Sequence, residues 1–188
     1  FYALAVKGSD IFITCNGDDT KGWVSKITMK DGKPGKLMPF IATKVATNVD
    51  APTGATISPD GMLVIGQVGE INIPADSLLT YYDPAKGKMV KHLKTGLNDF
   101  VAIGYSERGV LYGLHYSRIA PDDGGLYMLE PGEDAVKTTK VASVDKPTAM
   151  AFGPGGELYI TAIGTPEEPK ADEQARKPGM LLLMRGLK

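Results

Sequence analysis

The sequence predicts an all-β fold, and two observations support this prediction. Short apolar runs are separated by turns rich in Gly and Pro, of which the 188-residue chain has 23 and 13. In addition, no segment shows the 3.6-residue apolar period of an amphipathic helix. The most helix-like stretch, residues 166–179, is highly charged, lacks an apolar stripe and is interrupted by prolines, so we interpret it as a loop.

One hairpin pattern occurs four times along the chain. In three copies an apolar run, a turn containing Gly61, Gly109 or Gly156, and a second apolar run follow one another. These glycines are 48 and 47 positions apart, and the opening segment 6–14 fits the same frame. A period of about 40–50 residues is typical of the blades of a β-propeller.

The residues after each hairpin complete a blade. Third strands are expected to begin at Trp23, Leu78, Leu126 and Met180, and three of the copies continue through a turn into a fourth strand. This order gives a four-stranded antiparallel meander, and radial repetition of the meander gives a β-propeller. We therefore expect one domain, residues 1–188, with four four-stranded blades roughly at 1–46, 47–96, 97–143 and 144–188.

The number of blades raises a question about closure. Four blades are the lower limit of the known propeller range. An open ring leaves strand edges without partners, which favours completion of the ring by further strands. We expect the chain to be the C-terminal part of a six-bladed ring that a second chain or copy completes; a four-bladed ring is the alternative.

Composition and motifs exclude several classes of function. A net charge of −1 gives no electrostatic basis for binding nucleic acid or an acidic membrane surface. No apolar run approaches the roughly 18 residues of a membrane span. The single cysteine, Cys15, excludes an internal disulfide. The sequence also has no Ser-centred elbow, phosphate-binding loop, zinc-ligand spacing or dinucleotide fingerprint.

Two stretches carry a family resemblance. PTGATISPDGMLVIG, beginning at Pro52, and PTAMAFGPGGELYIT, beginning at Pro147, resemble the blade signature of the NHL, gluconolactonase (SMP-30) and strictosidine-synthase-like superfamily of six-bladed propellers. The ending, residues 147–188, is most similar to the extracellular propellers of the scytonemin-cluster family. This resemblance implies that the protein is secreted or periplasmic.

The loops that enter the innermost strands offer candidate metal ligands. In a propeller these loops lie at one rim of the central channel, where function is commonly located. They carry Asp50, Asn98, Asp99 and Asp145, whose oxygen atoms are suitable ligands for Ca²⁺. The alternative is that these side chains cap the turns by accepting bonds from nearby backbone N–H groups.

The resemblance to gluconolactonase-type enzymes weakens at the position that matters for catalysis. These enzymes often carry a metal-binding Asn directly after the Pro of the entering loop, where this chain has Thr53 and Thr148. The corresponding segment of the third copy keeps Asn98. We assign no catalytic residue.

The loops between second and third strands offer candidate ligand-binding residues. The stretch 115–123 is chemically the most varied, because its His can act as a base or metal ligand and its Arg can clamp an anion. A surface histidine at the end of a strand is the alternative interpretation of His115. We predict ligand binding by His115, Tyr116, Arg118 and Glu70.

Three hypotheses about function follow. The first is an exported binding module that engages a partner protein or small ligand through its loop face, without a complete catalytic site. The second is a divalent-metal-dependent hydrolase or lactonase of the gluconolactonase type, with Asn98 and Asp99 joined by Asp50 or Asp145 as ligands. The third is a structural subunit that completes a ring with another chain.

Overall fold

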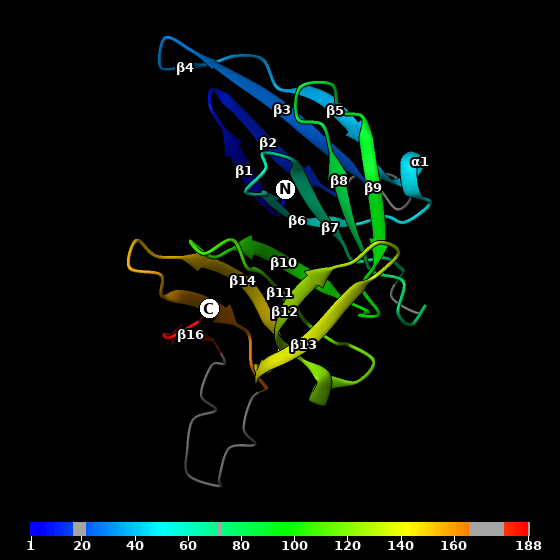
Figure 1. Ribbon diagram of the computed structural model, residues 1–188, viewed down its shortest axis with the longest axis vertical. Coiled ribbons are helices and arrows are strands. Elements are labelled where there is room, and N and C mark those ends of the chain that lie inside the picture. The colour runs from blue at the N-terminus through cyan, green and yellow to red at the C-terminus, as the bar shows by residue number, and fades with distance from the viewer. Residues whose placement is uncertain (17–21, 71–72, 166–178, 188) are drawn as a thin grey trace, which may run out of the picture.

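A computed structural model describes residues 1–16, 22–70, 73–165 and 179–187. The predicted loop at 166–179 therefore lies almost wholly outside the described residues. The described chain forms four antiparallel sheets that are arranged as the blades of a β-propeller (Figure 1), which confirms the predicted fold class. No helix in the described part is long and apolar enough to cross a membrane.

The strands follow one another along the chain as neighbours in each blade. Blade 1 contains β1 (Leu4–Lys7), β2 (Asp10–Cys15), β3 (Trp23–Lys30) and β5 (Met38–Ala42), with the short β4 (Lys33–Pro34) paired to the end of β3. Blade 2 contains β6 (Pro52–Ile57), β7 (Leu63–Gln67), β8 (Leu78–Tyr82) and β9 (Met89–Lys94).

The second half of the chain repeats this order. Blade 3 contains β10 (Phe100–Tyr105), β11 (Leu111–His115), β12 (Gly125–Pro131) and β13 (Val136–Ser143). The described part of blade 4 contains β14 (Pro147–Phe152), β15 (Leu158–Ala162) and β16 (Met180–Met184). Three third strands begin at the predicted residue, and β12 begins one residue earlier.

The first hairpin of each of the last three blades depends on a glycine. Gly61, Gly109 and Gly156 have φ angles of 86°, 76° and 78°, in the left-handed region that glycine adopts without steric cost. In blades 2 and 3 the N–H of this glycine donates a hydrogen bond to the carbonyl of a serine in the turn, at 2.8 and 2.9 Å. The 47- to 48-residue spacing of these glycines therefore reports the spacing of the blades.

Consecutive blades pack through two different faces. Along the second strand of each blade, successive side chains point to opposite faces of the sheet. We call the face that carries Phe12, Val64, Tyr112 and Tyr159 the A face. The opposite face, which carries Ile11, Leu63, Leu111 and Leu158, is the B face. Three buried apolar clusters pair Phe12 with Leu63, Val64 with Leu111, and Tyr112 with Leu158. In every junction the A face of one blade therefore covers the B face of the next.

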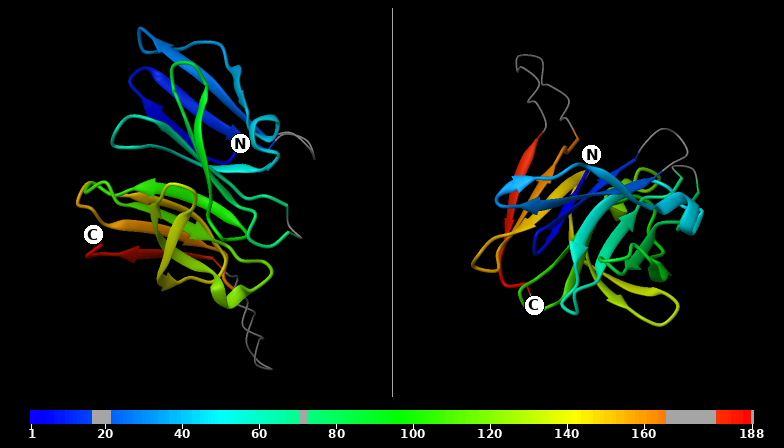
Figure 2. Two further views of the ribbon diagram at one scale, coloured as in Figure 1. Left: turned by 45° about the vertical axis from the view of Figure 1, so that its right-hand side comes forward. Right: turned by 90° about the horizontal axis from the view of Figure 1, so that it is seen from above.

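The blades form an arc with two ends. Inner strands contact their neighbours extensively from β1 to β6, from β6 to β10 and from β10 to β14, whereas no contact of similar extent joins blade 4 to blade 1 among the described residues. Blade 1 (blue) and blade 4 (orange to red) lie at the two ends of this arc (Figures 1 and 2).

Among the described residues, two short helices interrupt the all-β pattern. No sequence pattern predicts α1 (Thr43–Thr47), because five residues are too few to show a helical period. It ends at Asn48, whose left-handed conformation (φ 60°) lets its N–H bond to the Lys44 carbonyl at 2.8 Å. The 3₁₀ turn η1 (Pro121–Asp123) lies between β11 and β12. Helix α1 carries Lys44 to the loop face, where it contributes to the site described below.

Candidate functional site

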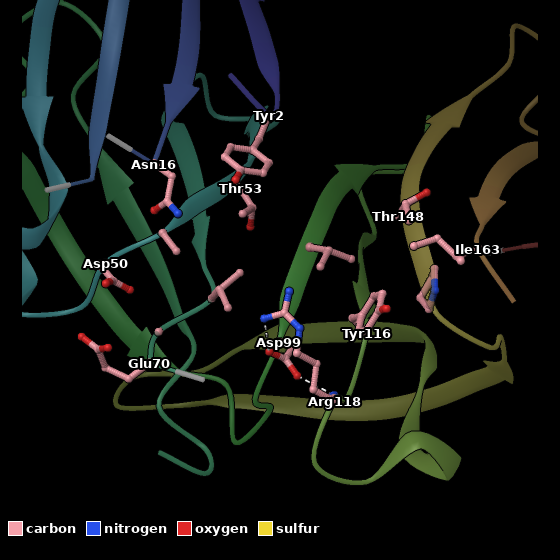
Figure 3. A pocket seen from close by; sticks show the side chains of 15 residues that line it. Tyr2, Asn16, Asp50, Thr53, Glu70, Asp99, Tyr116, Arg118, Thr148 and Ile163 are labelled. Atoms are coloured by element: carbon pink, nitrogen blue, oxygen red, sulfur yellow. Dashed lines mark hydrogen bonds and ion pairs between the residues drawn. The ribbon is translucent and has the colours of Figure 1, made fainter. Parts of the chain in front are cut away.

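A pocket of about 590 Å³ opens where the loop ends of all four blades meet (Figure 3). Its first ring of side chains comes from the starts of the inner strands. Thr53, Val101 and Thr148 are the second residues of β6, β10 and β14, and Tyr2 has the corresponding position ahead of β1. Each blade thus contributes one residue from the same place in its repeat.

A second ring comes from the ends of the second strands. Asn16, Val68, Tyr116 and Ile163 each follow the last residue of β2, β7, β11 or β15, and all four line the pocket. In blades 2, 3 and 4 the backbone N–H of this residue bonds to a carbonyl of the entering loop, at 2.9 Å in each case. The same hydrogen bond therefore sets the position of the second ring in three blades.

Blade 3 supplies a positively charged group. The guanidinium of Arg118 extends into the pocket beside Asp99 and Tyr116 (Figure 3). Asp99 is buried; its Oδ2 accepts a bond from the backbone N–H of Arg118 at 2.6 Å, and its Oδ1 lies 3.6 Å from Nη1. The guanidinium carbon is also 5.4 Å from the centre of the Tyr116 ring, within the range of a cation–π contact. Asp99 thus holds the arginine loop while half of the Arg118 side chain stays exposed.

Blade 2 supplies a group of carboxyls beside one lysine. Lys44 Nζ lies 2.7 Å from Glu70 Oε1 and 3.8 Å from Asp50 Oδ2. Burial, together with the neighbouring Glu70 carboxylate, raises the pKa of Asp50, whereas the bond from Lys44 lowers the pKa of Glu70. Burial also raises the pKa of Asp76, whose Oδ2 accepts the Glu70 N–H at 2.8 Å. Negative charge is therefore crowded on this wall of the pocket.

The charges of the pocket lie on one side only. Asp50, Glu70, Asp99 and Arg118 belong to blades 2 and 3, so the lining has three carboxylates and one guanidinium. The Lys44 ammonium, beside Glu70 and Asp50, offsets part of this negative charge. The described lining from blades 1 and 4 consists of uncharged residues, with hydroxyl, amide and apolar groups. A ligand in this pocket meets an acidic wall on one side and a neutral wall on the other.

The structure brings three of the four predicted ligand-binding residues together. Glu70, Tyr116 and Arg118 line the pocket, but His115 lies beneath it and is only 2% exposed. His115 Nε2 accepts the Asn98 N–H at 3.2 Å, and the imidazole packs edge-on against Tyr127. Burial lowers the pKa of His115, which keeps the ring neutral. In this structure His115 holds the entering loop of blade 3.

The four predicted metal ligands do not converge. Asp50 and Asp99 line the pocket, whereas Asn98 Oδ1 accepts the Ala75 N–H at 2.6 Å and Asp145 is outside the lining. Within residues 1–16, 22–70, 73–165 and 179–187, no group of three His, Cys, Asp or Glu side chains could hold a metal ion. The observed bonds of Asn98 and Asp99 are those of residues that stabilise loops.

Sequence reasoning missed most of the neutral lining. The repeat could have revealed these residues, because positions at the same sequence distance from each hairpin glycine line the same ring of the pocket. From the sequence, Thr53 and Thr148 are notable only as positions where gluconolactonase-type enzymes often carry a metal-binding Asn. The missed residues of the two rings are Tyr2, Asn16, Thr53, Val68, Val101, Thr148 and Ile163.

Comparison with known proteins supports the fold. No protein-family model matches the chain, and no curated protein matches it. Kuenenia stuttgartiensis hydrazine synthase is similar in structure with a TM-score of 0.59 and 16% identity, over 85% of this chain and 42% of that chain. A Bacteroides caccae protein of unknown function gives a TM-score of 0.50 and 17% identity, over 85% of this chain and 52% of that one.

These similar structures are β-propeller folds, so the class of protein is a β-propeller. The chain spans about half the length of each of these two matches, or less. At this level of identity the similarity concerns the fold alone.

Proposed function

We propose that the protein is a noncatalytic propeller that binds a small polar ligand in the pocket at its loop face. The observation that carries this proposal is the double ring of lining residues contributed by all four blades. Pockets of several hundred cubic ångströms with a few convergent polar groups are the usual form of small-molecule sites. The rim also has an exposed guanidinium beside carboxylates, which provides directional recognition.

The charges favour a ligand with an amino group and several oxygen acceptors. Burial and the neighbouring Glu70 carboxylate raise the pKa of Asp50, and the ammonium of a ligand beside it would add to the favourable charge that Lys44 already supplies. Arg118 donates to hydroxyl or carbonyl oxygens, and Asn16 and the hydroxyl of Tyr2 lie on the neutral wall. A hydroxylated amine such as an amino sugar combines both features.

Calorimetric titration with glucosamine, and with glucose as the uncharged comparison, tests this proposal. We expect saturable glucosamine binding that is at least tenfold stronger than glucose binding at pH 7. Asp50→Asn should remove this preference, whereas Asp134→Asn, in the exposed β12–β13 turn, should leave it unchanged. Binding should weaken as the pH falls toward 5, because the raised pKa of Asp50 means that its carboxylate is protonated earlier than usual.

Two results would contradict the proposal. One is the absence of saturable binding by either sugar. The other is binding that is equal for the two sugars and insensitive to Asp50→Asn, because such binding would not use the acidic wall.

The carboxylates of the pocket support a second proposal, a metal-dependent hydrolase. Asp50 and Asp99 both line the pocket, so two of the four predicted ligands reach the same cavity. Under this proposal the carboxylates of Asp50 and Asp99 would hold Ca²⁺, and the metal would supply polarisation of a lactone carbonyl. Calcium titration and a gluconolactonase assay test it: calcium-dependent turnover that is lost in Asp99→Ala supports the enzyme, and full activity in that variant rejects it.

Two further properties are proposals of the same kind. Export rests on the family resemblance alone, and fractionation of the native cells, with the protein found inside the cytoplasm, would reject it. Completion of the ring by a second chain or copy is the other: among the described residues no extensive contact joins blade 4 to blade 1, and a particle with the mass of one chain in light scattering would reject it.

A further inference from the structure

Arg118 brings unused hydrogen-bond donors into the pocket. Its guanidinium has five N–H groups. Within the described part of the chain none of them donates a hydrogen bond, and the contact with Asp99, 3.6 Å between Nη1 and Oδ1, is longer than an N–H···O bond. Lys44 differs in this respect, because its Nζ lies 2.7 Å from Glu70 Oε1. The lysine therefore has a close carboxylate partner in the chain and the arginine has none among the described residues.

The loop that carries Arg118 is nevertheless firmly held. The backbone N–H of Tyr116 donates to the Asp99 carbonyl at 2.9 Å, and the backbone N–H of Arg118 donates to Asp99 Oδ2 at 2.6 Å. Between these two residues, Ser117 is 1% exposed and its hydroxyl donates to the Ala120 carbonyl. The guanidinium carbon also lies 5.4 Å from the centre of the Tyr116 ring. These contacts fix the base of the side chain and leave the N–H groups of the guanidinium available to a ligand.

A guanidinium held in this way favours an anionic partner. It is planar and always charged, and two of its parallel N–H groups match the two oxygens of a carboxylate. Asp99 balances part of the positive charge, but its Oδ2 already accepts a backbone N–H. The matching carboxylate is therefore expected on the ligand.

The guanidinium and the acidic wall belong to one cavity. Arg118, Asp50 and Glu70 all line the pocket of about 590 Å³, and Arg118 is the only cation of its described lining (Figure 3). A ligand that uses both features carries a positive group and a negative group. A phosphate ester has about 1.5 to 2 negative charges at pH 7, so the three carboxylates of the lining disfavour it more than a singly charged carboxylate.

We infer that Arg118 binds a carboxylate of the ligand, so that the ligand is an amino sugar acid, an assignment that rests on the proposed function and names the class of its ligand. The ammonium of this ligand lies beside Asp50 and Glu70. Its carboxylate accepts two hydrogen bonds from the Arg118 guanidinium. The two charged groups of one small molecule then hold it in a single orientation.

Calorimetric titration with four sugars tests this assignment. Glucose, glucosamine, glucuronic acid and glucosaminuronic acid differ only in whether they carry an amino group and whether a carboxylate replaces the primary alcohol. At pH 7 we expect glucosaminuronic acid to bind about tenfold more tightly than glucosamine, as is typical of a charge-assisted pair of hydrogen bonds. Glucosamine 6-phosphate should bind more weakly than glucosaminuronic acid.

Substitution of the arginine identifies the group responsible. Arg118→Gln should abolish the difference between glucosaminuronic acid and glucosamine. Arg108→Gln, in the exposed β10–β11 turn, is the matched control and should keep it. The Arg118 side chain is half exposed, so we expect an unaltered circular dichroism spectrum in the variant. Because the measured quantity is a ratio of two affinities, a general loss of binding does not imitate the expected result.

The sugar pairs separate this inference from the proposed function. A protein that prefers glucosamine to glucose, but does not prefer glucosaminuronic acid to glucosamine, keeps the proposed function and overturns the inference. A preference for the acid that survives Arg118→Gln, or tighter binding of glucosamine 6-phosphate, also overturns it. A preference for glucuronic acid over glucose that Arg118→Gln removes, with no response to the amino group, rejects the proposed amine and supports the carboxylate at Arg118.

Discussion

Blades 2 and 4 share one repeat but differ in what covers them. Every residue of β7 in blade 2 is buried, whereas β15 in blade 4 alternates between buried and exposed residues. The strands have the same register and the same hairpin glycine, so the difference does not come from the blade itself. It comes from packing between blades, because blade 3 covers blade 2 whereas no described residues cover the equivalent face of blade 4. The burial of a propeller strand is thus a property of the junction.

Truncating the equivalent leucine in blade 2 and in blade 4 should give the largest difference in the free energy of unfolding. Leu79→Ala removes a fully buried side chain from the junction of blades 2 and 3, and we expect it to lower the free energy of unfolding by about 3 kcal/mol. Leu181→Ala, at the same position of blade 4, should cost less than about 0.5 kcal/mol in dilute solution. Urea denaturation measures both values. Equal costs at low protein concentration would contradict the interpretation of blade 4 as an open end.

Adding a methyl group at the same face should give a smaller effect. A Cβ at Gly66 would lie 2.8 Å from Cδ1 of Phe100, across the junction of blades 2 and 3. We expect Gly66→Ala to lower the free energy of unfolding by about 2 kcal/mol through overpacking. The equivalent Thr161 of blade 4 carries its side chain in the open, so Thr161→Ala should be nearly neutral. Thermal denaturation of the two variants compares the junctions; a neutral Gly66→Ala would mean that Phe100 moves freely.

The smallest expected effect is on the pH dependence of stability, through His115, the last residue of β11. Burial lowers the pKa of His115 below the ordinary value, so the unfolded chain takes up a proton as the pH falls while the folded chain does not. Stability is therefore complete above the unfolded pKa and is lost as the pH falls toward the folded one. One titrating group changes the free energy of unfolding by at most about 1.4 kcal/mol per pH unit.

His115→Gln should flatten the stability profile between pH 7 and pH 5. Blade 2 already has a buried Gln67 at this position, whose Nε2 donates to the Val49 carbonyl of its own entering loop at 2.5 Å. His92→Gln, on the outer strand β9, is the matched control substitution. An unaltered slope in His115→Gln would show that another group is responsible.

The strand plan could be predicted because its signals are local. A glycine with positive φ between two apolar runs specifies a hairpin wherever it occurs, and Gly61, Gly109 and Gly156 set the blades 48 and 47 residues apart. The helix α1 could not be predicted, because five residues contain no periodicity and its position depends on the path from β5 to β6.

The site was predictable only in part. Glu70, Tyr116 and Arg118 lie in the chemically rich loops, and composition alone pointed to them. Tyr2 and Thr148 were missed because a tyrosine or threonine at the start of a strand has no distinctive pattern. His115 has the chemistry of a ligand residue, but its burial follows from strand pairing that composition does not reveal.

The sequence by itself determined the elements that depend on neighbouring residues: the hairpins and the four-fold repeat of the blade. Only the tertiary structure decided which faces are covered and which polar side chains meet at the pocket. The physical reason is that turn geometry and strand periodicity are properties of a few consecutive residues. Burial and charge crowding, such as that of Asp50 with Glu70, arise between residues that the chain brings together from separate segments.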